Sequence, residues 1–191
     1  MGLGNLKRWS HPTWHLFHGI AEQISDEYYK KNKKAVLQIY KDICLNLPCP
    51  YCRKHATMYL KRNNMEVLKI KKELKNYLYI FHNTVNKRTT GKIEKEEVLE
   101  KYKMMNVEVA LQIFLINFFK PYYVHHDFSS WQKNYLKDRL NKYFEKNWDK
   151  MFIGIKNPYI DNYKYQLDNK IPMFDGTAYK RYPDLKYLYD K

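Results

Sequence analysis

Two cysteines separated by two residues, Cys49 and Cys52, have the types and the spacing of a redox pair. Pro48 and Pro50 interrupt the preceding segment, and residues from Arg53 onward follow at helical spacing. A proline costs little in the first turn of a helix, so the pair is predicted to lie at a helix N-terminus. The helix dipole and the neighbouring cations would favour the thiolate there, and two cysteines this close can exchange a disulfide with a substrate.

The same spacing is compatible with two other interpretations. Cys-x-x-Cys is half of a typical zinc site, which His55, His82 or another histidine would complete. The two cysteines are also compatible with buried thiols that have no chemical role. The motif alone leaves these alternatives open, and the rest of the chain has to decide between them.

Length and composition predict one helical domain with an appendage. The 191 residues can bury a sizeable core, and three cysteines in such a chain are not a disulfide scaffold. Six glycines and seven prolines argue against a β-sandwich or barrel. No run of apolar residues is long enough for a membrane span, and no apolar segment follows Lys7 and Arg8, so no secretory signal is visible.

The net charge of +15 is concentrated in the first half of the chain. Residues 1–92 carry 18 Lys and Arg against 6 Asp and Glu, whereas residues 93–191 carry 17 against 14. A basic half suggests an anionic ligand, an acidic partner or nucleic acid. A solvated lysine-rich surface is the simpler explanation, and no nucleic-acid-binding signature accompanies the charge, so nucleic acid is not the predicted partner.

Apolar residues that recur every three to four positions predict four helices before Gly91, with a lysine-rich link at residues 30–34. Four helices with short links form a compact bundle. Cys44 is expected to be a small buried residue of the second helix. The four predicted helices run from His11 to about Tyr29, from Ala35 to Leu45, from Pro50 to Arg62 and from Met65 to Gly91.

The second half of the chain is predicted to add helices and then lose regular structure. Helices are expected from Glu94 to Lys101, from Val107 to Phe119 and from Trp131 to Trp148. Tyrosines among prolines and aspartates follow, without periodicity. The predicted division is a first domain at 1–92, an additional helical region at 93–155 and an irregular Tyr-rich tail at 156–191. His125 and His126 lack supporting carboxylates or cysteines, so no metal site is predicted.

Two further stretches place polar residues on inner helix faces. Trp14 and His18 are one turn apart, and His82 and Asn86 share a face beside Asn83. Such side chains need partners. A packed bundle rarely supplies so many, so a polar ligand between helices is the economical explanation.

The order Trp-x-x-x-His, Cys-x-x-Cys and His-Asn-x-Val-Asn resembles the FAD-linked sulfhydryl oxidases of the Erv/ALR family. The segment Leu-Pro-Cys-Pro-Tyr-Cys-Arg-Lys-His is most similar to the copies in large double-stranded DNA viruses. The resemblance covers roughly residues 9–92 and implies an all-α fold, a four-helix bundle holding FAD and usually a homodimer.

The resemblance also implies roles for individual residues. Cys52 would lie against the isoalloxazine, and Cys49 would be the more accessible cysteine that meets substrate. Three sequence differences stand against the family pattern: Ser10-His11 replaces a Gly-Arg, Tyr77 replaces a tryptophan, and the segment up to Lys92 is one residue longer. The FAD-binding residues implied are Trp14, His18, His82, Asn83, Val85, Asn86, Lys87, Arg88 and Lys92.

The implied activity is oxidation of dithiols, with electrons passed from FAD to oxygen to give hydrogen peroxide. The implied partners are dithiol proteins or a separate dithiol carrier, because no second cysteine pair is present for an internal shuttle. The viral resemblance implies a location in the cytoplasm of the infected host cell and packaging in the virion.

Two rival functions are considered beside this one. A thioredoxin-like dithiol protein also uses Cys-x-x-Cys, but that fold needs alternating strands and helices, and the first ninety residues show no convincing strand. A non-enzymatic basic helical binding module with a Cys/His zinc site is the other. Colour separates them, since a flavoprotein is yellow and a zinc module is colourless.

Overall fold

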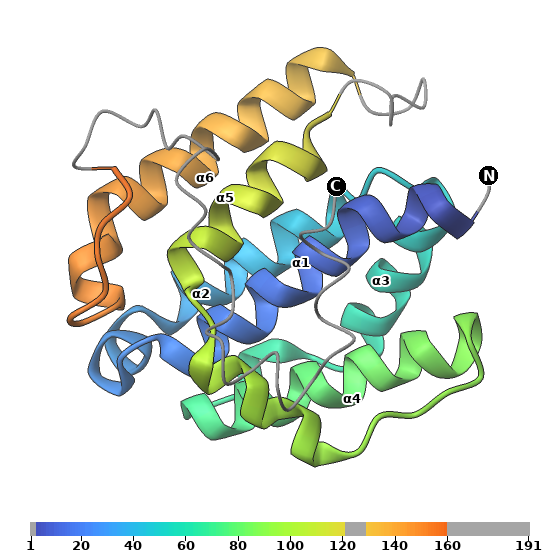
Figure 1. The fold of residues 1–191 in the computed structure, drawn as a ribbon, viewed down its shortest axis with the longest axis horizontal. Coiled ribbons are helices and arrows are strands. Elements are labelled where there is room, and N and C mark those ends of the chain that lie inside the picture. Colours follow the sequence, from blue (N-terminus) through green and yellow to red (C-terminus); the bar gives the residue numbers. More distant parts are fainter. Residues whose placement is uncertain (1–2, 121–128, 160–191) are drawn as a thin grey trace.

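The computed structural model describes residues 3–120 and 129–159, and the described part is built from helices without strands (Figure 1). The all-α class predicted from hydrophobic periodicity is therefore confirmed. The Tyr-rich segment beyond residue 159 and the pair His125 and His126 lie outside the described residues.

The first two helices are separated at a different place from the one predicted. Helix α1 spans Leu3–Gln23 and α2 spans Asp26–Leu45. Ser25 caps α2, because its side chain accepts a hydrogen bond from the backbone N–H of Tyr28 at 3.0 Å. The lysine-rich segment 30–34, predicted to be a link, lies inside α2 instead, since lysine is a good helix former on a solvated face. Within this segment the helix is kinked at Asn32, whose backbone is not helical (φ −117°, ψ 19°).

The helix that begins at the cysteine pair has the predicted bounds. Helix α3 spans Pro50–Arg62, with Cys49 as its N-cap residue and Pro50 in the first turn. The predicted fourth helix is divided into a short 3-10 helix, η1 (Met65–Val67), and α4 (Lys71–Thr89). Gly91 follows α4 with φ 71°, a left-handed conformation that glycine adopts without a Cβ penalty.

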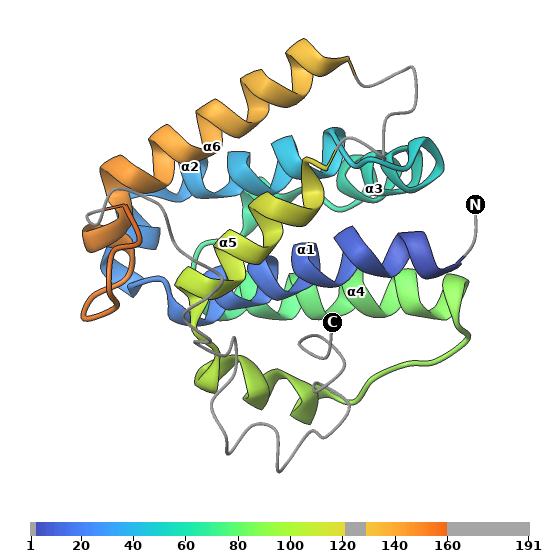
Figure 2. The ribbon, with the colours of Figure 1, turned by 45° about the horizontal axis from the view of Figure 1, so that its top comes forward.

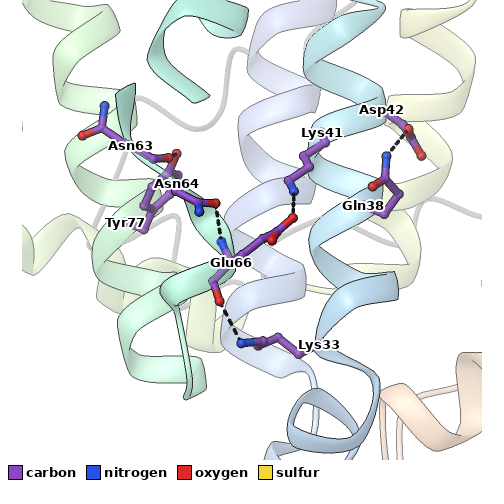
Figure 3. Close-up of polar contacts among 8 residues, drawn as sticks. All are labelled: Lys33, Gln38, Lys41, Asp42, Asn63, Asn64, Glu66 and Tyr77. Atoms are coloured by element: carbon purple, nitrogen blue, oxygen red, sulfur yellow. Dashed lines mark hydrogen bonds and ion pairs between the residues drawn. The ribbon is translucent and has the colours of Figure 1, made fainter. Parts of the chain in front are cut away.

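The connection between α3 and α4 is tied to α2 and to α4 itself (Figure 3). Lys41 of α2 forms an ion pair with the Glu66 carboxylate at 2.9 Å, and Lys33 donates to the Glu66 carbonyl oxygen at 2.9 Å. The Tyr77 hydroxyl of α4 donates to the carbonyl oxygen of Asn63 at 2.7 Å. These contacts hold the C-terminal end of α3 in place relative to α2 and α4.

The chain beyond α4 packs back onto the first two helices. A 3-10 helix, η2 (Glu96–Met104), leads to α5 (Val107–Phe118), and α6 (Ser130–Met151) follows. Helix α5 packs on α1 and α6 lies along α2 (Figure 2). The buried apolar side chains of α1, α2, α5 and α6 belong to one continuous cluster, which includes Phe17, Tyr40, Phe114 and Trp148. The domain boundary at residue 92 stays a prediction.

In the described part of the chain, no helix has both the length and the apolar character that a membrane crossing requires.

Candidate active site

The sulfur atoms of Cys49 and Cys52 lie 2.6 Å apart at the N-terminus of α3. Both cysteines are free thiols in the structure. The Cys49 sulfur also accepts a hydrogen bond from the backbone N–H of Cys52 at 3.2 Å, so it acts as the helix cap. Because the sulfurs are already this close, the pair can close a disulfide with little movement of the backbone.

A cavity of about 600 Å³ opens beside this pair, between α1, α3 and α4. The side chain of Cys52 is part of its wall, whereas Cys49 is not. This volume lies within the range of small-molecule and cofactor sites, roughly 300–1,000 Å³. The lining residues that carry the argument below are His11, Trp14, Cys44, Cys52, His55, Tyr59, Arg62, Phe81, His82, Val85, Asn86 and Arg88.

Aromatic rings from three helices form the apolar part of the wall. Trp14 of α1 stacks on His82 of α4 with ring centroids 4.0 Å apart and an interplanar angle of 7°. Trp14 also meets Phe81 edge to face, and Phe81 stacks on Tyr59 of α3 at 4.2 Å. The three cavity-lining helices therefore contact one another through flat rings, which suit a planar ligand.

Behind the aromatic wall, two histidine rings share a hydrogen bond. His18 Nε2 and His82 Nδ1 lie 3.0 Å apart, and the His18 ring stacks on Tyr102 of η2. Burial lowers the pKa of His82 to about 3, and nearby Lys101 and His11 contribute. Burial is also the largest cause that lowers the pKa of His18, and the charges of His82 and Lys101 lower it further. Both rings are therefore neutral near pH 7, with one donating to the other.

The charged part of the wall is positive. Arg62 of α3, Arg88 of α4 and His11 of α1 line the cavity, and no Asp or Glu among residues 3–120 and 129–159 does. The Arg88 guanidinium lies 5.4 Å from the ring centre of Tyr51, the residue between the two cysteines. An anionic group in the cavity would meet these cations.

The thiol of Cys52 is not acidic in the structure, contrary to the sequence-based expectation. Burial raises the pKa of Cys52 to about 12, and the hydrogen bond to Cys49 and its charge add to the rise. The positive charge of Arg88 acts in the opposite direction. The expectation was wrong for the free dithiol because partial removal from water and the neighbouring sulfur outweigh the helix N-terminus.

The relative exposure of the two cysteines also differs from the prediction. Cys49, expected to be the more accessible, is 8% exposed, whereas Cys52 is partly exposed toward the cavity. The reason is local: as the cap residue, Cys49 turns its sulfur toward the backbone of α3 and joins the buried cluster beside Leu47. Cys44, expected to be buried, is 2% exposed and borders the cavity.

The structure brings some of the predicted cofactor residues to the cavity and not others. The ones that line it are Trp14, His82, Val85, Asn86 and Arg88. His18 lies behind His82. The Asn83 amide instead holds the chain after α4, donating to the Glu94 carbonyl oxygen at 2.9 Å and accepting from the Glu94 N–H at 3.0 Å. Lys87 and Lys92 are exposed and outside the lining.

Several lining residues were not singled out from the sequence. Tyr59 and Arg62 follow Cys52 at 7 and 10 positions, the spacing of one helix face, and this periodicity could have identified them. His11, one turn before Trp14 on α1, was noted only as a difference from the family pattern, and the same periodicity could have placed it on the wall. Tyr102 had no local signal, because η2 reaches His18 only through the tertiary fold.

No group of three or more metal-binding side chains occurs among the described residues.

Comparison with known proteins decides the family. The sequence profile of the Erv1/Alr family matches residues 11–105, which span α1 to η2. A FAD-linked sulfhydryl oxidase of African swine fever virus (a Kenyan isolate) is 30% identical over 111 residues, covering 56% of this chain and 92% of the viral protein.

The chain belongs to the Erv1/Alr family.

Other viral proteins show the same similarity. The FAD-linked sulfhydryl oxidase of a Malawian isolate of African swine fever virus is 30% identical over 111 residues, again 56% of this chain and 92% of the relative. A protein of Invertebrate iridescent virus 3 named for the same activity is 25% identical over 100 residues, 51% of this chain and 68% of the relative. No solved structure matches the chain significantly.

The cavity of this Erv1/Alr protein fits FAD in size and in its chemical groups. Its stacked rings offer flat surfaces to the flavin and adenine rings. Arg62 and Arg88 offer positive charge to the pyrophosphate, and no carboxylate of the described residues lines the wall to repel it. Cys52 places a sulfur on the wall at the redox pair.

Proposed function

We propose that this protein forms disulfides in dithiol substrates through Cys49 and Cys52 and passes the electrons to oxygen through FAD. The family and the names of its viral relatives support an FAD-linked thiol oxidase. The observation that carries the proposal is the position of Cys52: its sulfur is 2.6 Å from that of Cys49 and is also part of the cavity wall.

The chain's own residues perform the thiol chemistry. A substrate thiolate attacks the Cys49 sulfur of the oxidised pair, the Cys49–Cys52 bond breaks, and its electron pair leaves with Cys52. The second substrate thiol, as thiolate, then attacks the mixed disulfide and releases Cys49. Two electrons and two protons have passed from the substrate to the pair. Since Cys52 faces the cavity and Cys49 does not, a thiolate from outside the cavity is assigned to Cys49.

The binding residues have separate tasks. Trp14, His82, Val85 and Asn86 would hold the ring systems of FAD, and Arg88 would meet its phosphates. When bound, FAD supplies the two-electron acceptor that re-oxidises the cysteine pair and reduces oxygen to hydrogen peroxide. The positive charge of Arg88 also lowers the pKa of Cys52 and so favours its departure as a thiolate.

The remaining expectations follow from the family and from the relatives. The substrates are dithiol proteins or a separate dithiol carrier, and a homodimer is the proposed assembly. Because the relatives are viral proteins, we place the activity in the infected cell, with virion proteins as candidate substrates.

The proposal is tested by spectrum and turnover together. The purified protein should carry a flavin spectrum, consume oxygen with dithiothreitol and release peroxide that catalase destroys. Removal of FAD should abolish turnover, and its return should restore it. A colourless protein that takes up no FAD and oxidises no dithiol would contradict the proposal.

A further inference from the structure

Cations flank the cysteine pair on two helices: Arg53 and Lys54 follow Cys52 in α3, and Lys87 precedes Arg88, whose guanidinium lies over Tyr51, in α4. We define Tyr51, Arg53, Lys54, Lys87 and Arg88 as the basic platform. Tyr51 is 63% exposed, although it lies between the two redox cysteines. The Arg88 guanidinium lies 5.4 Å from its ring centre, and the His55 ring meets it edge to face at 4.3 Å. An exposed ring held from two sides is an ordered contact surface.

The sequence around the platform contains no acidic residue. None occurs from residue 43 to 65 or from residue 74 to 93, the stretches that contain α3 and most of α4. Within the described part of the chain, no ion pair includes a cation of α3 or of the last turn of α4. The positive charge of the platform is therefore not neutralised within the described chain.

FAD accounts for one of the four platform cations, Arg88, and not for the other three. The cations that line the cavity are the ones placed to meet its pyrophosphate, Arg62 and Arg88 among them. Arg53, Lys54 and Lys87 do not line the cavity, and both lysines are exposed. These three cations remain available to a molecule that approaches the cysteine pair from outside.

We propose that the platform docks an acidic protein segment, so that the preferred substrates carry Asp or Glu beside the dithiol to be oxidised. This inference rests on the proposed function. Complementary charge raises the rate of encounter at a site and disfavours partners of like charge. The exposed ring of Tyr51 supplies an apolar contact next to the reacting sulfurs. The protein would therefore discriminate between substrates when they bind, before the thiol–disulfide exchange.

The test uses two peptides that share one Cys-Xaa-Xaa-Cys dithiol and differ only in flanking Glu or Lys residues. For the FAD-loaded protein, kcat/KM should be at least about tenfold higher for the acidic peptide at about 0.01 M salt. The ratio of the two values should fall toward one at about 1 M salt, where charges are screened within a few ångströms. Because both peptides carry the same dithiol, any effect of salt on the thiol–disulfide exchange itself changes both kcat/KM values equally and cancels in their ratio.

Charge reversal locates the effect. Lys54→Glu should lower the acidic-to-basic ratio about fivefold, and it favours helix formation because glutamate suits the N-terminal turns of α3. The matched control is Lys72→Glu, another exposed lysine, which lies about 22 Å along α4 from Lys87. It makes the same change in net charge, and the two variants are compared at about 0.1 M salt, where the Debye length is about 10 Å. At that salt concentration Lys72→Glu should leave the ratio within about twofold of the wild-type value.

Binding is measured apart from turnover, by fluorescence anisotropy with versions of the peptides in which serine replaces both cysteines. Tighter binding of the acidic version supports the platform. If that difference appears while dithiothreitol is not oxidised, the proposed function fails and the docking surface stands. Equal kcat/KM for both peptides, or equal effects of the two substitutions, overturns the inference. A third result also overturns it: an oligonucleotide binds more tightly than either peptide, and Lys54→Glu weakens that binding but leaves the acidic-to-basic peptide ratio unchanged. The platform would then bind nucleic acid.

Discussion

His18 and His82 join the first and fourth helices of the bundle through a single hydrogen bond between ring nitrogens 3.0 Å apart. His82 stacks on Trp14 at the cavity wall, and His18 stacks on Tyr102 of η2. The cavity wall is thereby connected to η2. Because the bond needs one protonated and one bare nitrogen and burial lowers the pKa of both rings, the two rings are neutral and of complementary tautomers.

The histidine pair should make stability depend on pH. Burial lowers the pKa of both rings in the folded protein, to about 3 for His82, while the unfolded chain keeps values near 6.5. The unfolded chain therefore binds more protons below about pH 6.5, and the free energy of unfolding should fall as the pH drops below that value. We expect a lower urea midpoint at pH 5.5 than at pH 7.5 for the FAD-saturated protein.

Replacement of both rings by glutamine should remove much of this dependence. The remainder is expected from His15 and His55, whose pKa values are also lowered by burial. His55→Gln is the comparison variant: His55 lies outside the hydrogen-bonded pair, so its replacement should remove less of the pH dependence than the double replacement. A wild-type midpoint that is equal at the two pH values would show that the pair is not buried in the neutral form.

Asn83 and Asn86 should have different effects on FAD, although they lie in the same motif. Asn86 lines the cavity, whereas the Asn83 amide makes two hydrogen bonds to the backbone of Glu94. We expect Asn86→Ala to lower the FAD content and to reduce the rise in melting temperature when FAD is added. Asn83→Ala should lower the free energy of unfolding by about 1–3 kcal/mol, and with it the melting temperature, because both hydrogen bonds to Glu94 are lost. Its FAD content should stay near the wild-type value. Equal flavin loss in both variants would contradict this assignment.

The sequence was sufficient for the parts of the fold that depend on local signals. Prolines and the following helical spacing located α3 correctly, and a strongly apolar run located α5. The cysteine spacing and the His82–Asn86 helix face identified two walls of the cavity. These features could be predicted because each is determined within one or two turns of one helix.

Features that depend on competition or on tertiary contacts could not be predicted in this way. The lysine-rich segment at residues 30–34 suggested a link, but the cap at Ser25 moved the break between the first two helices. The pKa of Cys52 depends on burial and on the Cys49 sulfur, which the helix-dipole argument omitted. The role of Asn83 depends on Glu94, eleven residues later in the chain.

A substitution at Trp148 of α6 tests whether α5 and α6 unfold together with the helices that line the FAD cavity. Its side chain is 1% exposed and belongs to the same buried cluster as α1 and α2. We expect Trp148→Phe to lower the free energy of unfolding and to shift helix loss and flavin release to the same lower urea concentration. Exposed Trp131, replaced by phenylalanine in the same helix, is the control and should change little. Separate transitions for helix loss and flavin release would show two independent units.

The two cysteines should be distinguishable by the visible spectrum of the FAD-loaded variants. In Cys49→Ser, the sulfur of Cys52 stays on the cavity wall, and its thiolate beside the flavin should give long-wavelength absorbance. Cys52→Ser should lack it, because Cys49 does not line the cavity. Loss of Cys49 removes two of the three causes that raise the pKa of Cys52, so the absorbance should titrate below about pH 12 and fade on acidification. The reverse pattern would exchange the roles of the two cysteines.

The most direct test of the central claim is the rate of oxygen consumption by three FAD-loaded variants with dithiothreitol. Cys49→Ser and Cys52→Ser should each lose dithiol oxidation, because neither can form the disulfide that accepts the substrate's electrons. Cys44→Ser should retain most of the wild-type rate, since Cys44 borders the cavity but lies outside the pair whose sulfurs are 2.6 Å apart. Turnover near the wild-type rate in either Cys49→Ser or Cys52→Ser would contradict the claim that this pair carries the reaction.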